Sequence, residues 1–148
     1  MNLPLFLAAL LLSASPALAD GILFLKCDET RVFTTKSHWR DGDTTHLENE
    51  DKEVLVLGID RKKETMLINN SKVDIVIKND EAIDSGTFDN GKAKDTRVIH
   101  TTLSPPHIRY GNGKVVIKED FSTTITDVAI TADCTKIDSA DFEKFLNQ

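Results

Sequence analysis

Residues 123–134 read TTITDVAITADC, and from residue 128 onward every second position is small or apolar: Val128, Ile130, Ala132 and Cys134. Successive side chains of a strand point to opposite faces of a sheet, so this pattern predicts a strand that buries one face and carries Cys134 on it. Asp127 separates the alternation from Ile125, which predicts a bulge or a break at that point.

The chain opens with a leader. Residues 1–19, MNLPLFLAALLLSASPALA, contain no charged side chain, and the small-residue site Ala17-Leu18-Ala19 follows an apolar run. This arrangement is typical of a signal peptide that is cleaved after Ala19. We therefore expect an exported chain, periplasmic or secreted, in which residues 20–148 form a single β domain. No later stretch is apolar enough to span a membrane, so we expect no membrane contact after cleavage.

The sequence holds one cysteine besides Cys134, and it lies at the other end of the domain. Cys27 follows the apolar run 22–25, ILFL, with Lys26 between them. Two cysteines in an exported chain predict a disulfide, whereas a redox enzyme would place them close together as C-x-x-C. A Cys27–Cys134 bridge would pin the first strand to the last.

Strand patterns dominate the region between the cysteines, because short runs rich in β-branched and aromatic residues alternate with turn residues. The candidate strands lie at 22–27, 31–35, 53–60, 64–68, 73–77, 82–83, 87–88, 96–103, 108–117 and 123–134. Allowing for hairpins among these segments, we expect a mostly β fold of about eight strands, either an antiparallel sandwich or a small up-and-down barrel.

Three local signals refine this expectation. Asn112-Gly113 lies between β-forming residues at 108–117, which favours a type I′ hairpin centred on that pair. Residues 38–53, HWRDGDTTHLENEDKE, are polar throughout and predict a long exposed loop or an irregular hairpin tip. In the final segment Asp138 can cap a short helix whose apolar side would lie on the sheet.

Charge and motif patterns exclude several classes of function. The chain has 24 acidic and 18 basic residues, a net charge of -6, and its one basic triplet, Arg61-Lys62-Lys63, is typical of a solvated turn. Nucleic-acid binding is therefore not expected. We find no zinc-ligand spacing, no G-x-S-x-G and no glycine-rich phosphate loop, so no cofactor and no catalytic residue are predicted.

The best candidate for a binding surface surrounds the single tryptophan. Trp39 lies between His38 and Arg40, ahead of an acidic stretch at 41–53, so it either packs on the edge of the core or serves as an exposed anchor for a partner. The candidate surface comprises Trp39, Arg40, Asp41, Asp43 and His46. Whether the acidic stretch also binds a cation is left open by the sequence.

A resemblance rests on four segments: Ala17-Leu18-Ala19, the early strand with Cys27, Val56 to Asp60, and Ala132-Asp133-Cys134. With these the chain resembles small exported proteins of Gram-negative bacteria that have no assigned activity. The resemblance implies a periplasmic location and no particular site.

Three classes of function are compatible with these features. We expect first a non-enzymatic, protein-binding or inhibitor-like module whose partner is another exported protein. The alternative is a small barrel that carries an apolar ligand in its interior. A hydrolase whose site is assembled only in space is a third class. An enclosed apolar cavity would favour the carrier, and a filled core would favour the binding module.

Overall fold

The computed structural model describes residues 21–148, so the predicted signal peptide, residues 1–19, lies outside the described residues. The elements are β1 (Ile22–Trp39), β2 (Thr44–Asp60), β3 (Thr65–Ile68), β4 (Ser71–Asp74), β5 (Val76–Lys78), β6 (Glu81–Asp89), β7 (Ala93–Thr102), β8 (His107–Lys118), β9 (Ser122–Lys136) and α2 (Ser139–Leu146). All nine strands belong to one antiparallel sheet in the order β4-β3-β2-β1-β9-β8-β7-β6-β5.

The two edges of this sheet nearly meet. β4 and β5 occupy the edges, and Ile75 alone separates them along the chain. The Ile75 side chain is buried in the core, and its backbone N–H donates to the carbonyl of Glu64 at 2.9 Å. The sheet therefore curls into an almost closed barrel, which confirms the mostly β, antiparallel prediction and favours the barrel over the sandwich.

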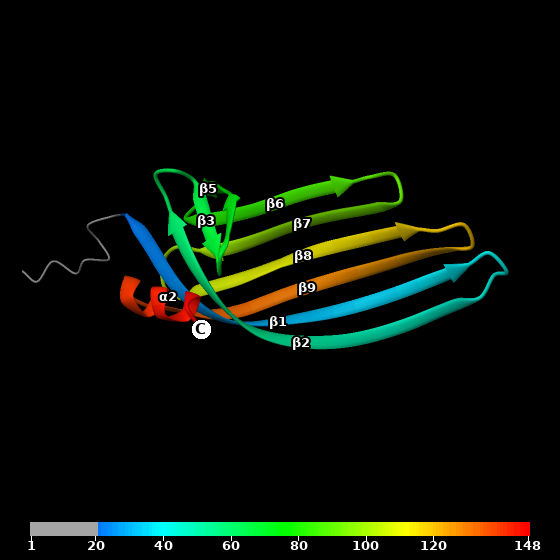
Figure 1. Ribbon diagram of the computed structural model, residues 1–148, viewed down its shortest axis with the longest axis horizontal. Helices are drawn as coiled ribbons and strands as arrows, with labels where there is room; N and C mark the ends of the chain where they lie inside the picture. Colours follow the sequence, from blue (N-terminus) through cyan, green and yellow to red (C-terminus); the bar gives the residue numbers. More distant parts are fainter. Residues whose placement is uncertain (1–20) are drawn as a thin grey trace, which may run out of the picture.

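Closure is confined to one end of the molecule, because the strands differ greatly in length. β1 has 18 residues, whereas β5 has three. β3 pairs with β2 only at Leu57–Asp60, and β5 pairs with β6 only at Glu81–Ile83. Figure 1 shows the six long strands side by side, with β3 and β5 gathered at one end and three hairpin tips at the other. We call these parts the closed half and the open half.

The core fills the interior of the closed half. Leu25, Leu57, Ile59 and Met66 are fully buried and belong to one cluster with both cysteines. In β1, β2 and β9 the core residues occupy alternate positions, so the alternation seen at 128–134 does mark the inner face. Aliphatic side chains occupy the space that an interior ligand would need.

The disulfide prediction is confirmed. Cys27 lies directly opposite Cys134 in the register between β1 and β9, and the two sulfur atoms are bonded. The bridge therefore joins the first and last strands at the level of the core.

Helix α2 covers the outer face of the closed half, also as predicted. The Asp138 side chain accepts a hydrogen bond from the backbone N–H of Asp141 at 2.7 Å, which is the N-cap arrangement. The buried Phe142 ring packs against Phe24, with ring centroids 4.8 Å apart. Gly58 makes room for this contact, because a Cβ atom there would be 3.4 Å from both rings.

The predicted hairpin at Asn112-Gly113 is wrong, since β8 runs straight through both residues. The glycine that matters is Gly111, where a Cβ atom would lie 2.3 Å from the carbonyl oxygen of Val98 on β7. Gly111 therefore allows close strand approach, whereas a Cβ atom at Gly113 would lie 3.6 Å from the nearest neighbour, an ordinary contact.

Other predicted breaks are also absent. β9 continues through Asp127, whose carboxylate faces outward and lies 3.5 Å from Lys114 Nζ. Of the two possibilities for residues 22–35, one first strand or a hairpin, the structure has the single strand, and the two segments predicted at 82–83 and 87–88 join into one strand, β6. Of the two alternatives for residues 38–53, the long loop is wrong, and a hairpin tip is present at residues 40–43, because β1 ends at Trp39 and β2 begins at Thr44. Exposed polar residues suggested a loop there, but the cross-strand ladder with β1 overrides that preference.

We expect the disulfide to supply a large part of the stability. It closes a loop with a sequence separation of 107 residues, so the double variant Cys27→Ala, Cys134→Ala should lose about 4 kcal/mol of unfolding free energy. Urea unfolding monitored by circular dichroism measures this loss. An unchanged midpoint would show that the bridge adds nothing to the β1–β9 pairing.

Candidate functional site

The main candidate site is the inner face of the open half, which continues the barrel interior and is not covered by a second layer from residues 21–148. Strand register places alternate residues of β1, β2, β6, β7, β8 and β9 on this face. Its apolar members are Phe33, Trp39, Leu47, Phe88, Val115, Ile117 and Val128. We call this surface the trough; Leu47 is 66% exposed, so the trough is open to solvent.

Hydroxyl groups in the trough satisfy one another across strands. Thr35 and Thr126 form a side-chain hydrogen bond at 3.0 Å, and Ser37 and Thr124 form another at 3.1 Å. Because these hydroxyl groups already have partners, the apolar side chains are the groups in the trough most available for contact with another molecule.

Charged side chains gather on the opposite, outer face of the open half. They are Lys36, Glu48, Glu50, Lys52, Asp89, Lys94, Lys114, Lys118 and Asp127. On the trough, by contrast, the described residues beyond the belt described next include two charged members, Asp51 on β2 and Asp95 on β7. The open half therefore has the pattern of a sheet with one buried face, although that face is uncovered.

A belt of ion pairs separates the trough from the apolar core. Glu29 accepts from Arg31 Nε at 2.7 Å and from Arg109 Nε at 2.9 Å, and Arg31 also pairs with Glu53 at 2.8 Å. On the other side of the barrel Arg97 pairs with Asp84 at 3.4 Å. A hollow of about 500 Å³ lies over this belt, at the inner end of the trough.

The centre of the belt is buried. The side chains of Glu29 and Arg109 are 1% and 3% exposed, and Arg109 also donates to the Thr101 hydroxyl at 3.3 Å. Burial by itself would lower the pKa of Arg31, but its hydrogen bond to Glu29 and the nearby charges of Glu29, Glu53 and Asp51 raise that pKa. Arg31 therefore stays cationic, and the belt is a matched set of fixed charges.

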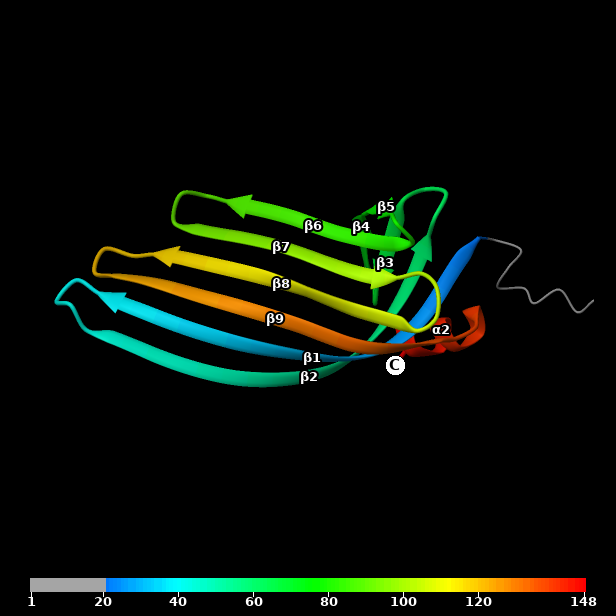
Figure 2. The same cartoon turned by 180° about the vertical axis from the view of Figure 1, so that it is seen from behind.

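The borders of the trough are free strand edges, formed by β2 and β6 (Figure 2). On β2, the Asn69 side chain accepts from the Val56 N–H at 3.1 Å, and the Asn69 N–H donates back to the Val56 carbonyl at 2.9 Å. Residues 44–54 beyond this point pair with β1 only. Such an edge can add another strand, although Glu48, Glu50 and Asp51 discourage pairing with a second acidic chain.

Of the residues predicted from the sequence, Trp39 reaches the trough. It ends β1 with the parity of the core residues and is 47% exposed. Arg40, Asp41 and Asp43 form the adjoining turn, in which the Asp43 N–H donates to Asp41 Oδ1 at 3.0 Å. These four residues cluster at the outer tip of the trough.

His46 does not join that cluster, because it lies opposite Lys36 on the outer face of β2. The acidic stretch is likewise divided between the two faces. Within residues 21–148 no three or more His, Cys, Asp or Glu side chains are grouped as a metal ion requires.

A second polar cluster lies on the outer face. Glu81 accepts from Tyr110 at 2.8 Å and from His100 Nδ1 at 2.9 Å, and the two rings stack with centroids 5.0 Å apart. The hydrogen bonds from Tyr110 and His100 lower the pKa of Glu81, and the bond to Glu81 raises the pKa of Tyr110. The cluster clamps β6, β7 and β8 together.

Sequence reasoning missed both the trough and the belt. Glu29, Arg31, Arg97 and Arg109 look like ordinary surface charges in the sequence, and only the register of strands far apart in the chain brings them together. A partial signal was present, because Glu29 shares the parity of Leu25 and Cys27 and so belongs to the buried face.

Comparison of this chain with family models, with curated proteins and with solved structures gave no match. No helix among residues 21–148 has the length and apolar character needed to cross a bilayer. The fold itself defines the class: a disulfide-linked antiparallel barrel that closes at one end and opens into a trough at the other.

Neutralising Glu29 should weaken the fold strongly. Glu29→Gln leaves the buried Arg109 without its counter-charge, and we expect a loss of about 3 kcal/mol in unfolding free energy. The control Glu53→Gln breaks the partly exposed pair with Arg31 and should cost less than about 1 kcal/mol. Urea unfolding at neutral pH measures both, and equal losses would contradict a buried belt.

The Glu81 cluster predicts a defined pH dependence. Because the pKa of Glu81 is lowered in the folded state, its contribution is complete above the unfolded value of about 4.3 and is lost as pH falls through the lowered pKa. Because the pKa of Tyr110 is raised, its contribution is lost as pH rises through that raised value. Glu81→Gln should flatten both limbs of the stability profile, while Glu48→Gln, on the exposed edge, should leave them unchanged.

Proposed function

We propose that this protein is an exported, non-enzymatic binding module that holds a segment of another exported protein in the trough. The observation that carries the proposal is the inner face, where apolar side chains continue from the core and no element of the described part of the chain packs over them. An apolar face flanked by free strand edges can take up an extended segment by strand addition as well as by side-chain packing.

The contrast between the two faces of the open half indicates which face a partner would cover. A partner in the trough would bury apolar side chains while the charged outer face remained in water, as in the core and rim of protein interfaces. The exposed Trp39 lies where an aromatic anchor contributes most if the partner reaches the hairpin tip. The disulfide and the leader support an oxidising compartment for both proteins.

In the carrier alternative, the ligand would not lie inside the barrel. Aliphatic side chains fill the closed half, so an apolar ligand would have to lie in the trough or at a barrel mouth rather than inside. A filled core is the result that we expected for a binding module, so it favours that alternative over the carrier.

The test compares two substitutions on the same strand. Leu47→Asp puts a charge in the trough, whereas Val54→Asp puts one on the outer face, and both sites are at least half exposed. Immobilised protein should capture a partner from the periplasmic extract of its host. We expect Leu47→Asp and Trp39→Ala each to reduce capture at least tenfold, because either removes apolar burial at the interface.

Val54→Asp should leave that capture unchanged, and matched melting temperatures would show that all variants are folded. Equal capture by the Leu47 and Val54 variants would refute the trough as the binding surface. If the wild-type chain captures no protein, the binding-module proposal fails.

A further inference from the structure

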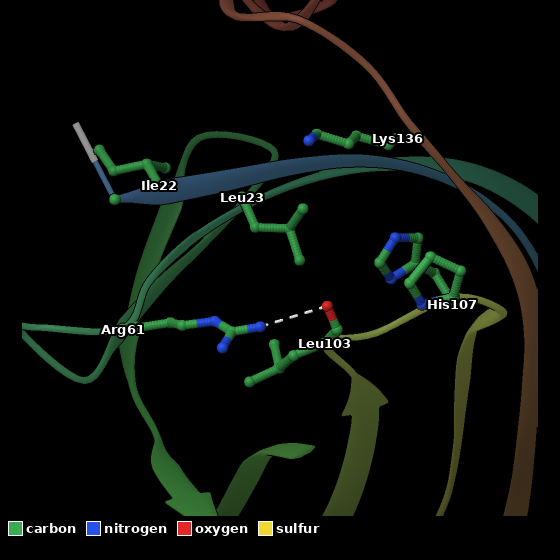
Figure 3. Close-up of a pocket in the computed structure, with 8 residues that line it drawn as sticks. Ile22, Leu23, Arg61, Leu103, His107 and Lys136 are labelled. Carbon is green, nitrogen blue, oxygen red and sulfur yellow. Dashed lines mark hydrogen bonds between the residues drawn. The ribbon is translucent and has the colours of Figure 1, made fainter. Parts of the chain in front are cut away.

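The closed half has a second opening, at the end of the barrel away from the trough. A hollow of about 410 Å³ lies there, lined by Ile22, Leu23, Leu103 and Pro105 together with Arg61, His107 and Lys136 (Figure 3). This size lies within the usual range for small-molecule sites, and barrel mouths are common places for them.

The charged groups that line this mouth are all basic. Arg61 Nη2 donates to the carbonyl oxygen of Leu103 at 3.2 Å, which holds the guanidinium at the rim (Figure 3). The nearest carboxylate, Asp80, lies 3.5 Å from the same nitrogen and also accepts from Ser104. Asp80 is not among the lining residues, so it pairs with Arg61 from outside the hollow.

The other two basic groups come from β8 and β9. Lys136 has the inner-face parity of Cys134 and lies opposite Leu25. His107 is almost buried, with Nδ1 3.2 Å from the Thr102 carbonyl oxygen. Because a carbonyl only accepts, Nδ1 carries a proton, and Nε2 is left for another partner.

The apolar groups form the other part of the site. In Figure 3 Leu23 and Leu103 lie between Arg61 on one side and His107 on the other. A bare inorganic anion would leave these leucines in water, whereas an alkyl group would cover them. Apolar groups beside two cationic side chains, Lys136 and the partly paired Arg61, match a molecule with an anionic head and a short apolar tail.

We propose that the barrel mouth is a binding site for small amphiphilic carboxylates. The carboxylate accepts hydrogen bonds from Arg61 and Lys136, and the tail packs on Leu23, Leu103 and Pro105. This assigns a role to Arg61, which the sequence pattern grouped with Lys62 and Lys63 as part of a solvated turn. The inference is independent of the proposed function, because the mouth and the trough lie on opposite sides of the filled core.

The experiment titrates the exported, oxidised protein with octanoate at pH 7.5 by isothermal calorimetry. Two further probes separate the contributions: 1-octanol has the same tail without the charge, and inorganic phosphate has charge without a tail. We expect saturable binding of octanoate at one site, and much weaker binding of both other probes. Amide chemical shifts should move at residues 22–23, 103–104, 107 and 136, and not in the trough.

Variants locate the site. Arg61→Gln and Lys136→Gln should each weaken octanoate binding about tenfold, the effect of losing one charge-assisted hydrogen bond. Lys62→Gln is the matched control, because Lys62 belongs to the same basic triplet but does not line the hollow. The Lys136 variant is needed because Arg61 also donates a hydrogen bond to the Leu103 carbonyl. Losing that bond in Arg61→Gln could lower stability and so weaken binding indirectly.

Three results would overturn the proposal. Equal affinity for 1-octanol would reduce the site to an apolar hollow, and equal affinity for phosphate would reduce it to a charge cluster. No binding of octanoate at millimolar concentration would exclude the site altogether. Leu47→Asp should leave octanoate binding unchanged, so failure of the trough and failure of the mouth are distinguishable.

Discussion

The short strands β3, β4 and β5 limit how far the barrel can close. At about 3.3 Å per residue, a strand of three or four residues spans only about 10–13 Å, whereas the 18 residues of β1 span about 60 Å. A barrel can close only over the length at which every strand position is filled. The closed half, its filled core and the belt follow from this mismatch, and so does the trough, because the remaining length of the long strands has neither a covering layer nor partners at its edges.

The ionic belt lies at the boundary between the apolar core and the solvent-exposed trough. An apolar core that opened directly into the trough would leave Leu55 and Ile99 at a wet boundary, but Glu29 and Arg109 occupy that boundary as a buried pair. Burying two charges is costly, and here the cost is offset because Glu29 accepts from two arginines and Arg109 also donates to Thr101. The belt also fixes the register of β1 against β8, although these strands are not neighbours and are joined only through β9.

Local patterns predicted the features that depend on a few adjacent residues. The alternation ending at Cys134, the Asp138 cap and the cysteine pairing each rest on such a pattern, and the structure confirms all three. The hairpin predicted at Asn112-Gly113 is wrong because the pair can turn a chain in isolation, whereas here β8 continues through it, and the neighbouring Gly111 lets β7 approach β8. The belt and the trough could not be predicted, because the partners of Glu29 are set by strand registers spanning about eighty residues. At 44–53 polar composition suggested a loop, since an edge strand with both faces exposed carries no alternation.

The features of the trough would favour self-association of the chain if nothing opposed it. Its β2 border has free backbone groups, and its inner face is apolar, which together favour pairing with a second copy. Against this, Glu48 and Glu50 lie along the same border, so an antiparallel β2–β2 pairing centred on Asn49 would place Glu48 opposite Glu50 of the second copy on both sides. Lys52 does little to reduce this repulsion, because its ammonium group already pairs with Glu50 at 3.4 Å and its backbone N–H donates to the Asp51 carboxylate. If the trough holds a partner, as we propose, the same charges would favour a segment that carries basic side chains outward and apolar ones inward, and would disfavour pairing with a second copy of this chain.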